Sequence, residues 1–263
     1  MGSGQVIIVI CKLLIGNYIV VIENLNTLDH ELMLWLNYDG GTFQDAFWYT
    51  LSQIPSWIPL YITIIFVMFL DAFRTVWPSY SPNGELQPSD GQKQKRWMKF
   101  ILLLLFTALV FAFTDQISAG IIKPLVQRPR PSHDSSIMDQ LHFVNDYHGG
   151  AYGFVSSHAA NCFGLAVWVS CLYKRRSLVI AMMLYAVLNC YSRIYLGVHF
   201  LGDIICGTIL GILCGWLGYF CYSRFCQRFS IPQNKSVNPL PITIMLWASL
   251  LAFAVYAVFI LFQ

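Results

Sequence analysis

Charged residues are scarce in this chain of 263 residues. Lysine, arginine, aspartate and glutamate make up only 11% of the sequence, whereas hydrophobic residues make up 57%. A soluble domain usually carries about 25% charged residues, so the composition excludes an ordinary soluble fold and indicates an integral membrane protein. The net charge of +3 is small, and the basic residues form no run with interleaved aromatics. The composition therefore gives no indication of a nucleic-acid partner.

No two cysteines have the C-x-x-C spacing that is typical of zinc and redox sites. Most of the eight lie inside apolar runs, where a thiol behaves as a small buried hydrophobe. They are Cys11, Cys162, Cys171, Cys190, Cys206, Cys214, Cys221 and Cys226. The sequence therefore predicts neither a disulfide framework nor a zinc site, and we expect no cofactor.

Long apolar runs dominate the rest of the chain. A membrane-spanning helix needs about 20 mostly apolar residues. The runs that qualify cover roughly residues 54–73, 97–118, 154–173, 177–195, 199–221 and 242–262. We therefore expect an all-α fold, a polytopic bundle of about six transmembrane helices. One membrane-embedded domain would fill residues 1–263, with its functional bundle at about 97–221, an N-terminal segment at 1–53 and a closing span at 242–262.

The N-terminal segment contains two further patterns. The apolar run over residues 5–22 is interrupted by Lys12, Gly16 and Asn17. Three interpretations of it stay open: a seventh span, an uncleaved signal-like segment, or a stretch without a structural role. Residues 27–37, TLDHELMLWLN, alternate apolar and polar side chains at helical spacing. This pattern predicts a short interfacial helix lying at the membrane surface.

Basic residues divide unevenly between the two sides of such a bundle. Most of them fall in three loops on one side, which the positive-inside rule makes cytoplasmic. These are Arg74, Lys93, Lys95 and Arg96, then Lys174, Arg175 and Arg176, then Arg224, Arg228 and Lys235, with Lys99 just inside the second span. The opposite side holds Lys123, Arg128, Arg130 and Arg193. Cations placed against the rule indicate a functional site.

Three polar stretches meet on that outer side. They are KPLVQRPRP at residues 123–131, GFVSSHAAN at 153–161 and YSRIYLGVHFLGD at 191–203. Together they supply cations, two histidines, one carboxylate and two hydroxyls. The candidate site residues are Lys123, Arg130, Ser156, Ser157, His158, Arg193, His199 and Asp203.

These residue types favour phosphate chemistry. Arginines can clamp phosphate oxygens bidentately, and a lysine adds a point charge. Ser156 and Ser157 lie where a helix begins, and a helix N-terminus favours anions. His199 and Asp203 are four residues apart and share a helix face. The carboxylate can hold one imidazole nitrogen while the other acts as a nucleophile or base, and His158 can act as a general acid.

The three stretches resemble the signature of the type 2 phosphatidic acid phosphatase family. That signature reads Lys, six residues, Arg-Pro; then Pro-Ser-Gly-His; then Ser-Arg, five residues, His, three residues, Asp. Residues 123–131 and 192–203 match its first and third parts with the spacing intact, whereas residues 155–158 read Val-Ser-Ser-His. Ser157 stands where the family has glycine. We expect serine to serve equally well there, because the position only needs to supply a backbone N–H. The resemblance covers roughly residues 97–221.

The resemblance implies a phosphatase that forms a phosphohistidine intermediate and needs no metal. His199 is then the nucleophile, and Asp203 orients it. His158 protonates the leaving oxygen and afterwards activates the water that releases phosphate. The phosphoryl oxygens would be held by Lys123, Arg130, Arg193, Ser156 and the backbone N–H of Ser157.

Arg128 lies outside the family signature. Both a substrate contact and an anchor that snorkels to the membrane surface stay open for it. His133, His142 and His148 lie in the polar loop that follows. We expect these three histidines to be solvated rather than to select a headgroup.

The expected reaction is hydrolysis of a phosphate monoester or pyrophosphate on a membrane lipid at the outer face. Candidate substrates are undecaprenyl pyrophosphate, phosphatidylglycerophosphate, phosphatidic acid and lipid A. The short chain favours a bacterial envelope lipid, with the site facing the periplasm from the inner membrane. The alternative is a transporter or flippase that binds phosphate lipids without hydrolysis, but it has no need of two histidines and an orienting aspartate.

Two other hydrolases use parts of the same constellation. A serine hydrolase built on Ser156 or Ser157 leaves the convergent cations unexplained. A metal hydrolase that used His158, His199 and Asp203 as ligands would lose its activity in excess chelator. Full activity in excess chelator would exclude this alternative, and the resemblance to the phosphatase family implies a reaction that needs no metal.

Overall fold

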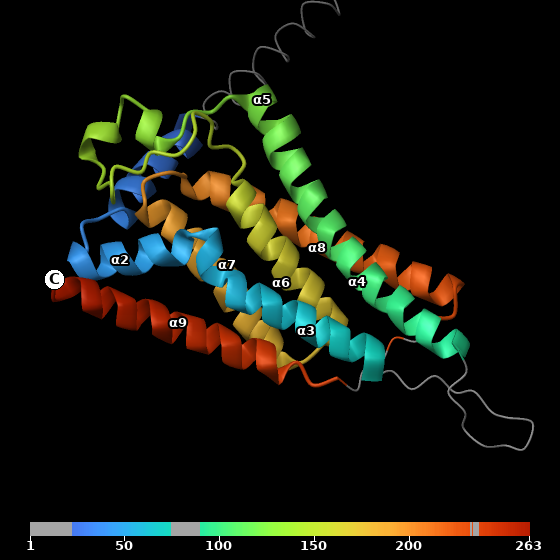
Figure 1. Cartoon of the computed structure of the whole chain (residues 1–263). Helices are drawn as coiled ribbons and strands as arrows, with labels where there is room; N and C mark the ends of the chain where they lie inside the picture. The colour runs from blue at the N-terminus through green and yellow to red at the C-terminus, as the bar shows by residue number, and fades with distance from the viewer. Residues whose placement is uncertain (1–22, 75–89, 232, 234–236) are drawn as a thin grey trace, which may run out of the picture.

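The computed structural model describes residues 23–74, 90–231, 233 and 237–263, so the interpretations of residues 5–22 lie outside it. The described residues form helices and loops with no strand, which confirms the predicted all-α fold (Figure 1). A helix covers residues 23–36. After it come α2 (Gly41–Ser52), η1 (Ile54–Trp57), α3 (Ile58–Arg74), α4 (Asp90–Asp115), the π-helical η2 (Gln116–Ile122), α5 (Lys123–Val126), η3 (Pro131–His133), η4 (Met138–Gln140), α6 (Ser157–Tyr173), α7 (Arg176–Tyr195), α8 (Leu201–Arg228) and α9 (Leu240–Leu261).

Within the described residues, five helical segments are long and apolar enough to cross a membrane. They are Ile54–Arg74, Gln94–Val126, Arg176–Tyr195, Leu201–Arg228 and Leu240–Leu261. Each corresponds to one of the predicted spans. The second of them runs without interruption through α4, η2 and α5, so it extends beyond the predicted end at residue 118. Lys123 therefore lies on the last turns of a spanning helix.

The remaining predicted span is α6, the central helix of the bundle. Its 17 residues rise about 26 Å, somewhat less than the ~30 Å hydrocarbon core of a bilayer. Most of its residues are buried, and it packs against α4, α7 and α8. Because protein rather than lipid surrounds it (Figure 1), this helix can be shorter than its neighbours. Its first turn, which follows the cap residue Ser156, is accordingly recessed in the protein.

Glycines on α8 let this helix lie directly against α6. Gly207, Gly211 and Gly215 are four residues apart and share one face of α8. A β-carbon at any of them would press on a main-chain carbonyl oxygen of α6 or of its cap residue Ser156, and such small residues permit close helix packing in membranes. This packing brings the starts of α6 and α8 together. There the N–H of Ser156 donates to the main-chain carbonyl of Asp203 at 3.0 Å.

The N-terminal segment packs against the end of the bundle at which α6 and α8 begin. The helix over residues 23–36 agrees with the predicted short helix. Its inward face carries Asp29 and Met33, which are buried, whereas Trp35 is 75% exposed. The second helix of this segment, α2, has no counterpart in the sequence analysis and packs against α7 and α9. Residues far from the three motifs therefore reach the same end of the bundle.

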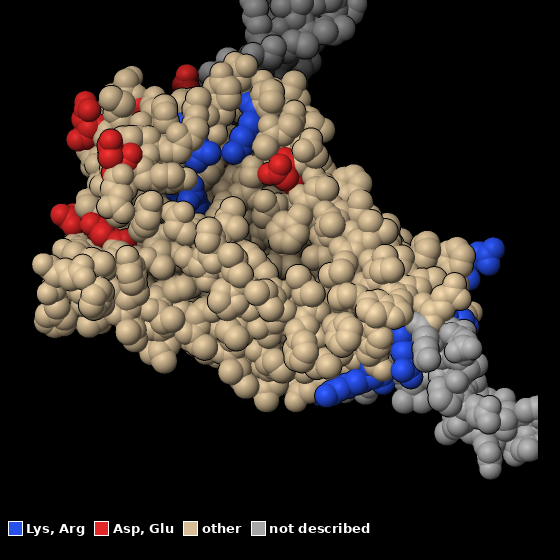
Figure 2. Space-filling model, viewed as in Figure 1, with Lys and Arg blue, Asp and Glu red and all other residues tan. Residues whose placement is uncertain are grey.

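Lysines and arginines gather at two places on the molecule (Figure 2). One group lies at the end where α3 finishes and α4 begins. Arg175, Arg176, Arg224 and Arg228 are exposed in the loops and helix ends of the side that the sequence analysis assigns to the cytoplasm. The second group is recessed in a hollow at the opposite end of the bundle (Figure 2). That hollow contains the candidate site.

Candidate active site

The three polar stretches converge around His199. Residues 123–131 follow the long α4–α5 helix, residues 153–161 open α6, and residues 191–203 join α7 to α8. Lys123, Arg130, His158 and Arg193 all lie close enough to His199 to act on its charge. The structure thus brings together residues that are up to 80 positions apart in the sequence.

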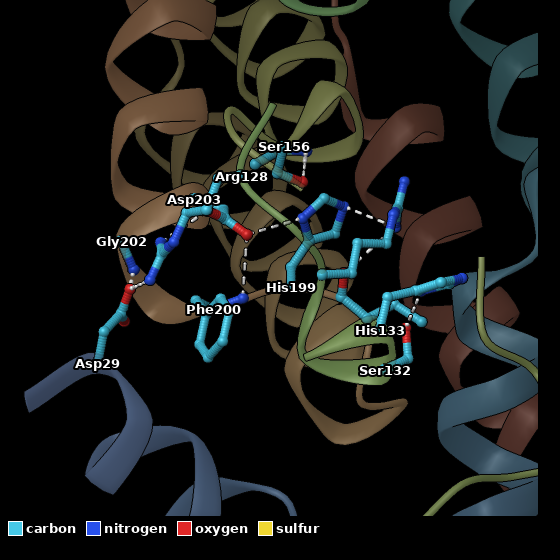
Figure 3. A network of polar contacts seen from close by, with 12 residues as sticks. Asp29, Arg128, Ser132, His133, Ser156, His199, Phe200, Gly202 and Asp203 are labelled. Atoms are coloured by element: carbon cyan, nitrogen blue, oxygen red, sulfur yellow. Dashed lines mark hydrogen bonds and ion pairs between the residues drawn. The ribbon is translucent and has the colours of Figure 1, made fainter. Parts of the chain in front are cut away.

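Two contacts fix the tautomer of His199 (Figure 3). Its Nδ1 lies 3.3 Å from Oδ2 of Asp203, and its Nε2 lies 3.2 Å from Nη1 of Arg130. A guanidinium can only donate hydrogen bonds, and an ionised carboxylate can only accept them. The proton of the neutral imidazole is therefore on Nδ1, and Nε2 carries the lone pair. This arrangement leaves Nε2 able to act as a nucleophile.

The turn between α7 and α8 positions the imidazole. Gly197 has a φ of +73°, a conformation that glycine adopts without the strain of a β-carbon. Asp203 lies in the first turn of α8 and accepts a hydrogen bond from the N–H of Phe200 at 3.1 Å. One carboxylate thus caps the helix and holds His199 at the same time. Nη1 of Arg130 also donates to the carbonyl of Val198 at 3.2 Å, which ties the cation to this turn.

Burial controls the protonation of His199, whose side chain is only 2% exposed. Burial lowers the pKa of His199 well below its usual value, and the positive charges of Arg130 and Arg193 lower it further. The ring is therefore uncharged at neutral pH, and the Nε2 lone pair is available across the physiological range.

His158 lies on the first turn of α6 and has a different partner. Its Nε2 is 3.4 Å from Oδ1 of Asn189. The amide of Asn189 is fixed by its own donation to the carbonyl of Tyr185 at 2.8 Å, so its oxygen faces the ring. Because an amide oxygen only accepts, Nε2 of His158 carries the proton. The two histidines thus have separate anchors and are able to take separate roles in proton transfer.

Three cations face the hollow. The two Nη atoms of Arg193 donate to the hydroxyls of Ser52 and Tyr147. The Nε atoms of Arg130 and Arg193 are buried and have no hydrogen-bond partner in the described part of the chain. Lys123 acts electrostatically on both guanidinium groups, and no hydrogen bond joins it to another described side chain. Buried donors without acceptors are rare in proteins, so this cluster favours an anionic ligand.

The start of α6 adds helix N–H groups to the same hollow. Ser156 caps the helix by accepting from the N–H of Ala159 at 3.3 Å. Ser157 is the first residue of α6, and its hydroxyl accepts from that of Ser118 at 2.8 Å. Ser157 is helical and does not have a positive φ, so a side chain causes no backbone strain there. The position can supply a backbone N–H as serine or as glycine.

We therefore expect Ser157→Gly to keep activity within about fivefold of wild type. The variant loses one hydroxyl–hydroxyl contact worth roughly 1 kcal/mol and retains the N–H. Phosphate release by the purified protein measures the effect, with Ser136→Gly in the exposed outer loop as the matched control. Activity far below wild type would show that the serine hydroxyl itself takes part in the reaction.

Arg128 points away from the cation cluster. Its Nη1 donates to Oδ1 of Asp203 at 2.9 Å, and its Nη2 donates to Oδ2 of Asp29 at 2.8 Å. The guanidinium also lies over the ring of Phe200, 4.2 Å from the ring centroid. Arg128 is thus engaged with protein groups on three sides.

Sequence reasoning missed four residues that support the site. Asn189 lies one turn before Arg193 on α7, and a polar side chain inside an apolar run is a signal that could have found it. Ser52 and Tyr147 hold Arg193 from α2 and from the outer loop. Asp29 comes from the N-terminal helix, and its sequence surroundings contain no signal of this contact.

The loop histidines divide into two groups. His133 is exposed, and His148 pairs with the exposed Asp146, as expected for solvated side chains. His142 differs, because its Nε2 lies 2.8 Å from Oδ1 of Asp45 on α2. It joins the outer loop to the N-terminal segment, and it does not lie among the cations of the hollow.

A family comparison agrees with this geometry. Residues 96–227 match the model of the PAP2 superfamily. The chain belongs to the PAP2 superfamily. This confirms the resemblance to type 2 phosphatidic acid phosphatases that the three motifs carry, and the protein is a membrane-embedded phosphatase of this superfamily.

Several PAP2 proteins are similar over long stretches. The lipid A 4'-phosphatase of Bacteroides thetaiotaomicron is 33% identical, over 84% of this chain and 86% of that protein. The lipid A 4'-phosphatase of Porphyromonas gingivalis is 29% identical, over 88% of this chain and 90% of that protein. The crystal structure of a PAP2-type phosphatidylglycerolphosphate phosphatase from Bacillus subtilis superposes with a TM-score of 0.51 at 20% identity, covering 80% of this chain and 89% of that one. That likeness shows the same fold.

Proposed function

We propose that the protein hydrolyses the phosphate monoester of a lipid A type glycolipid at the outer face of a bacterial inner membrane, through a phosphohistidine intermediate. The single observation that carries the reaction is the placement of His199, whose Nδ1 faces Asp203 while its Nε2 lies beside Arg130. The choice of substrate is supported by the similarity to two lipid A 4'-phosphatases over most of the chain.

The substrate phosphate would occupy the hollow among the three cations. The unpartnered Nε–H groups of Arg130 and Arg193 then gain acceptors, and Lys123 balances the remaining charge. The N–H groups at the start of α6, including that of Ser157, would donate to the same anion, as helix N-termini do. These donors are fixed before substrate arrives, so they can stabilise the charge that builds on the phosphoryl oxygens during transfer.

Chemistry then proceeds in two steps. Nε2 of His199 attacks phosphorus and the bond to the sugar oxygen breaks, while His158, which enters this step protonated on both ring nitrogens, gives that oxygen its Nδ1 proton and becomes neutral. Asp203 accepts the Nδ1 hydrogen bond and balances the positive charge that the phosphorylated ring acquires. In the second step His158 takes a proton from water, the hydroxide attacks phosphorus, and the N–P bond breaks to release phosphate and neutral His199. No metal takes part.

An apolar pocket is suited to contact the lipid part of the substrate. It lies between α4 and α8 and has a volume of about 280 Å³. Its lining is almost wholly apolar: Phe106, Leu109, Val110, Phe113, Ile117, Cys214, Leu217, Gly218 and Cys221. The two helices diverge towards the end that holds the hollow (Figure 1). A lipid with one acyl chain in this pocket would place its phosphate at the recessed start of α6.

Phosphate release from a panel of lipids tests this proposal. Purified protein in detergent would be given lipid A bisphosphate, phosphatidylglycerophosphate, phosphatidic acid and undecaprenyl pyrophosphate, with His199→Ala as the control. We expect lipid A to give the highest kcat/KM and to lose one phosphate by mass spectrometry. Faster hydrolysis of another lipid would overturn the substrate assignment, and binding without any phosphate release would favour the flippase alternative.

A further inference from the structure

Asp29, Arg128 and Asp203 form a chain of ion pairs that ends at His199 (Figure 3). Arg128 joins the two carboxylates at 2.8 Å and 2.9 Å. The side chain of Asp203 is fully buried, and those of Asp29 and Arg128 are 11% and 19% exposed. Buried ion pairs are strong only when every group is well placed, so their geometry is sensitive to the loss of any member.

Each carboxylate in this chain has both of its oxygens occupied. Oδ1 of Asp29 accepts from the N–H of Gly202 at 2.9 Å, while Oδ2 takes Arg128. A β-carbon at Gly202 would collide with the Asp29 carboxylate, so the glycine permits this approach. Oδ1 of Asp203 takes Arg128, while its Oδ2 takes the N–H of Phe200 and faces Nδ1 of His199. The orientation of Asp203 is thus defined from two sides.

The backbone also directs Arg128 inward. Gln127 adopts the left-handed conformation at a φ of +52° and ends α5, and Pro129 restricts the residue before it to extended conformations. The carbonyl of Arg128 accepts from the N–H of Gly153 at 2.9 Å. The side chain then packs on Phe200 and reaches Asp203, while Arg130 reaches His199 from the other side of the same proline.

We propose that Arg128 and Asp29 are positioning residues, which act on the reaction by holding Asp203 in the orientation that fixes the tautomer of His199. The inference rests on the proposed function, since it assumes that His199 is the nucleophile. Without Arg128, the Asp203 carboxylate would be held through Oδ2 alone, and the Oδ1 side of a buried charge would lose its partner. Asp29 lies outside residues 96–227, so the N-terminal helix becomes part of what supports catalysis.

Kinetic measurements distinguish a positioning role for Arg128 from the two alternatives, a substrate contact and a membrane anchor. A positioning residue does not touch substrate, so its loss lowers kcat and leaves KM almost unchanged. A substrate contact would raise KM, and a membrane anchor would change neither. We expect Arg128→Met to lower kcat on lipid A about 10–100-fold, the range typical of lost supporting contacts around a reacting group.

Conservative and double variants sharpen the test. Arg128→Lys keeps the charge and should recover part of kcat, and Asp29→Asn should lower kcat less than Arg128→Met does. In the double variant, Asp29→Asn should add little to Arg128→Met, because both act through one contact. The matched controls are Arg224→Met and Asp139→Asn, at exposed positions remote from the chain of ion pairs. A raised KM with unchanged kcat, or additive losses, would overturn the proposal.

A second measurement does not depend on turnover. Protein labelled with ¹⁵N-histidine reports the protonation of each ring nitrogen by NMR, and His199→Gln assigns the signals. We expect wild type to show the Nδ1-protonated ring at residue 199 and Arg128→Met to show a mixture of tautomers. An unchanged tautomer in folded Arg128→Met would refute the positioning role. Failure of wild type to hydrolyse any lipid would instead refute the proposed function, and the NMR result would still decide this inference.

Discussion

Replacing His199 by alanine should abolish turnover, with a loss of at least about 10⁴-fold in kcat, the scale seen when a covalent nucleophile is removed. Nε2 of His199 is held at 3.2 Å from Arg130, where a phosphoryl group would replace the guanidinium contact. Alanine leaves the anion site intact but removes the attacking atom. The variant should therefore still bind lipid A, with a Kd close to that of wild type.

The covalent intermediate gives a direct measurement of this prediction. Wild-type protein that is given ³²P-labelled substrate and denatured during turnover should carry phosphate that is labile in acid and stable in base, as expected for a phosphoramidate. His199→Ala should carry no label. His133→Ala, on the exposed outer loop, is the matched control and should be labelled normally. Undiminished turnover by His199→Ala would refute the assignment of the nucleophile.

The sequence predicted those parts of the site that depend on local spacing. His199 lies two residues before α8 begins and Asp203 lies in the first turn of that helix, so the predicted shared helix face is wrong, although the separation of four residues still allows their contact. The placement of Arg130, Arg193 and Ser156 near them follows from the order of the spans, because three helix ends must meet on one side. The apolar runs likewise predicted the spans, since length and hydropathy alone identify them.

Contacts between distant segments were not predictable in the same way. Asp29 and Asp203 are 174 positions apart, and nothing in the residues around Asp29 distinguishes it from a solvated carboxylate. Arg128 is surrounded by prolines and a second arginine, and although the family signature singles out Arg130, the sequence leaves open what Arg128 contacts. The directions of the Arg128 and Arg130 side chains depend on the left-handed conformation of Gln127. Glutamine does not require this conformation, so the sequence does not predict it.

The path of the second span was also invisible in the sequence. Its α-helix widens into a π-helix over Gln116–Ile122 before it returns to an α-helix at Lys123. A π-helical turn adds residues and rotates everything that follows it, and such turns are common near functional sites. A hydropathy profile is an average over a window of residues, so it does not detect this rotation. The sequence therefore placed Lys123 at the right end of the span but could not determine the face on which it lies.

Asparagine in place of Asp203 should lower kcat about 10⁴-fold, as expected when the residue that selects a histidine tautomer is lost. Asp203 accepts hydrogen bonds on both oxygens, from Arg128 on one side and from the N–H of Phe200 and His199 on the other. An asparagine side chain has one oxygen and one NH₂ group. One of its two faces must therefore present a donor to another donor.

Each of the two orientations of the asparagine amide is unfavourable, for a different reason. If the NH₂ group faces Arg128, a buried cation loses its partner and the side chain is pushed out of place. If it faces His199, it donates to Nδ1, and the ring proton moves to Nε2, where the attacking lone pair was. Initial rates of phosphate release and of phosphoenzyme formation should fall together, whereas the Tm of the folded protein should stay close to that of wild type. Asp139→Asn is the matched control, and turnover within tenfold of wild type in Asp203→Asn would contradict this account of how the nucleophile is prepared.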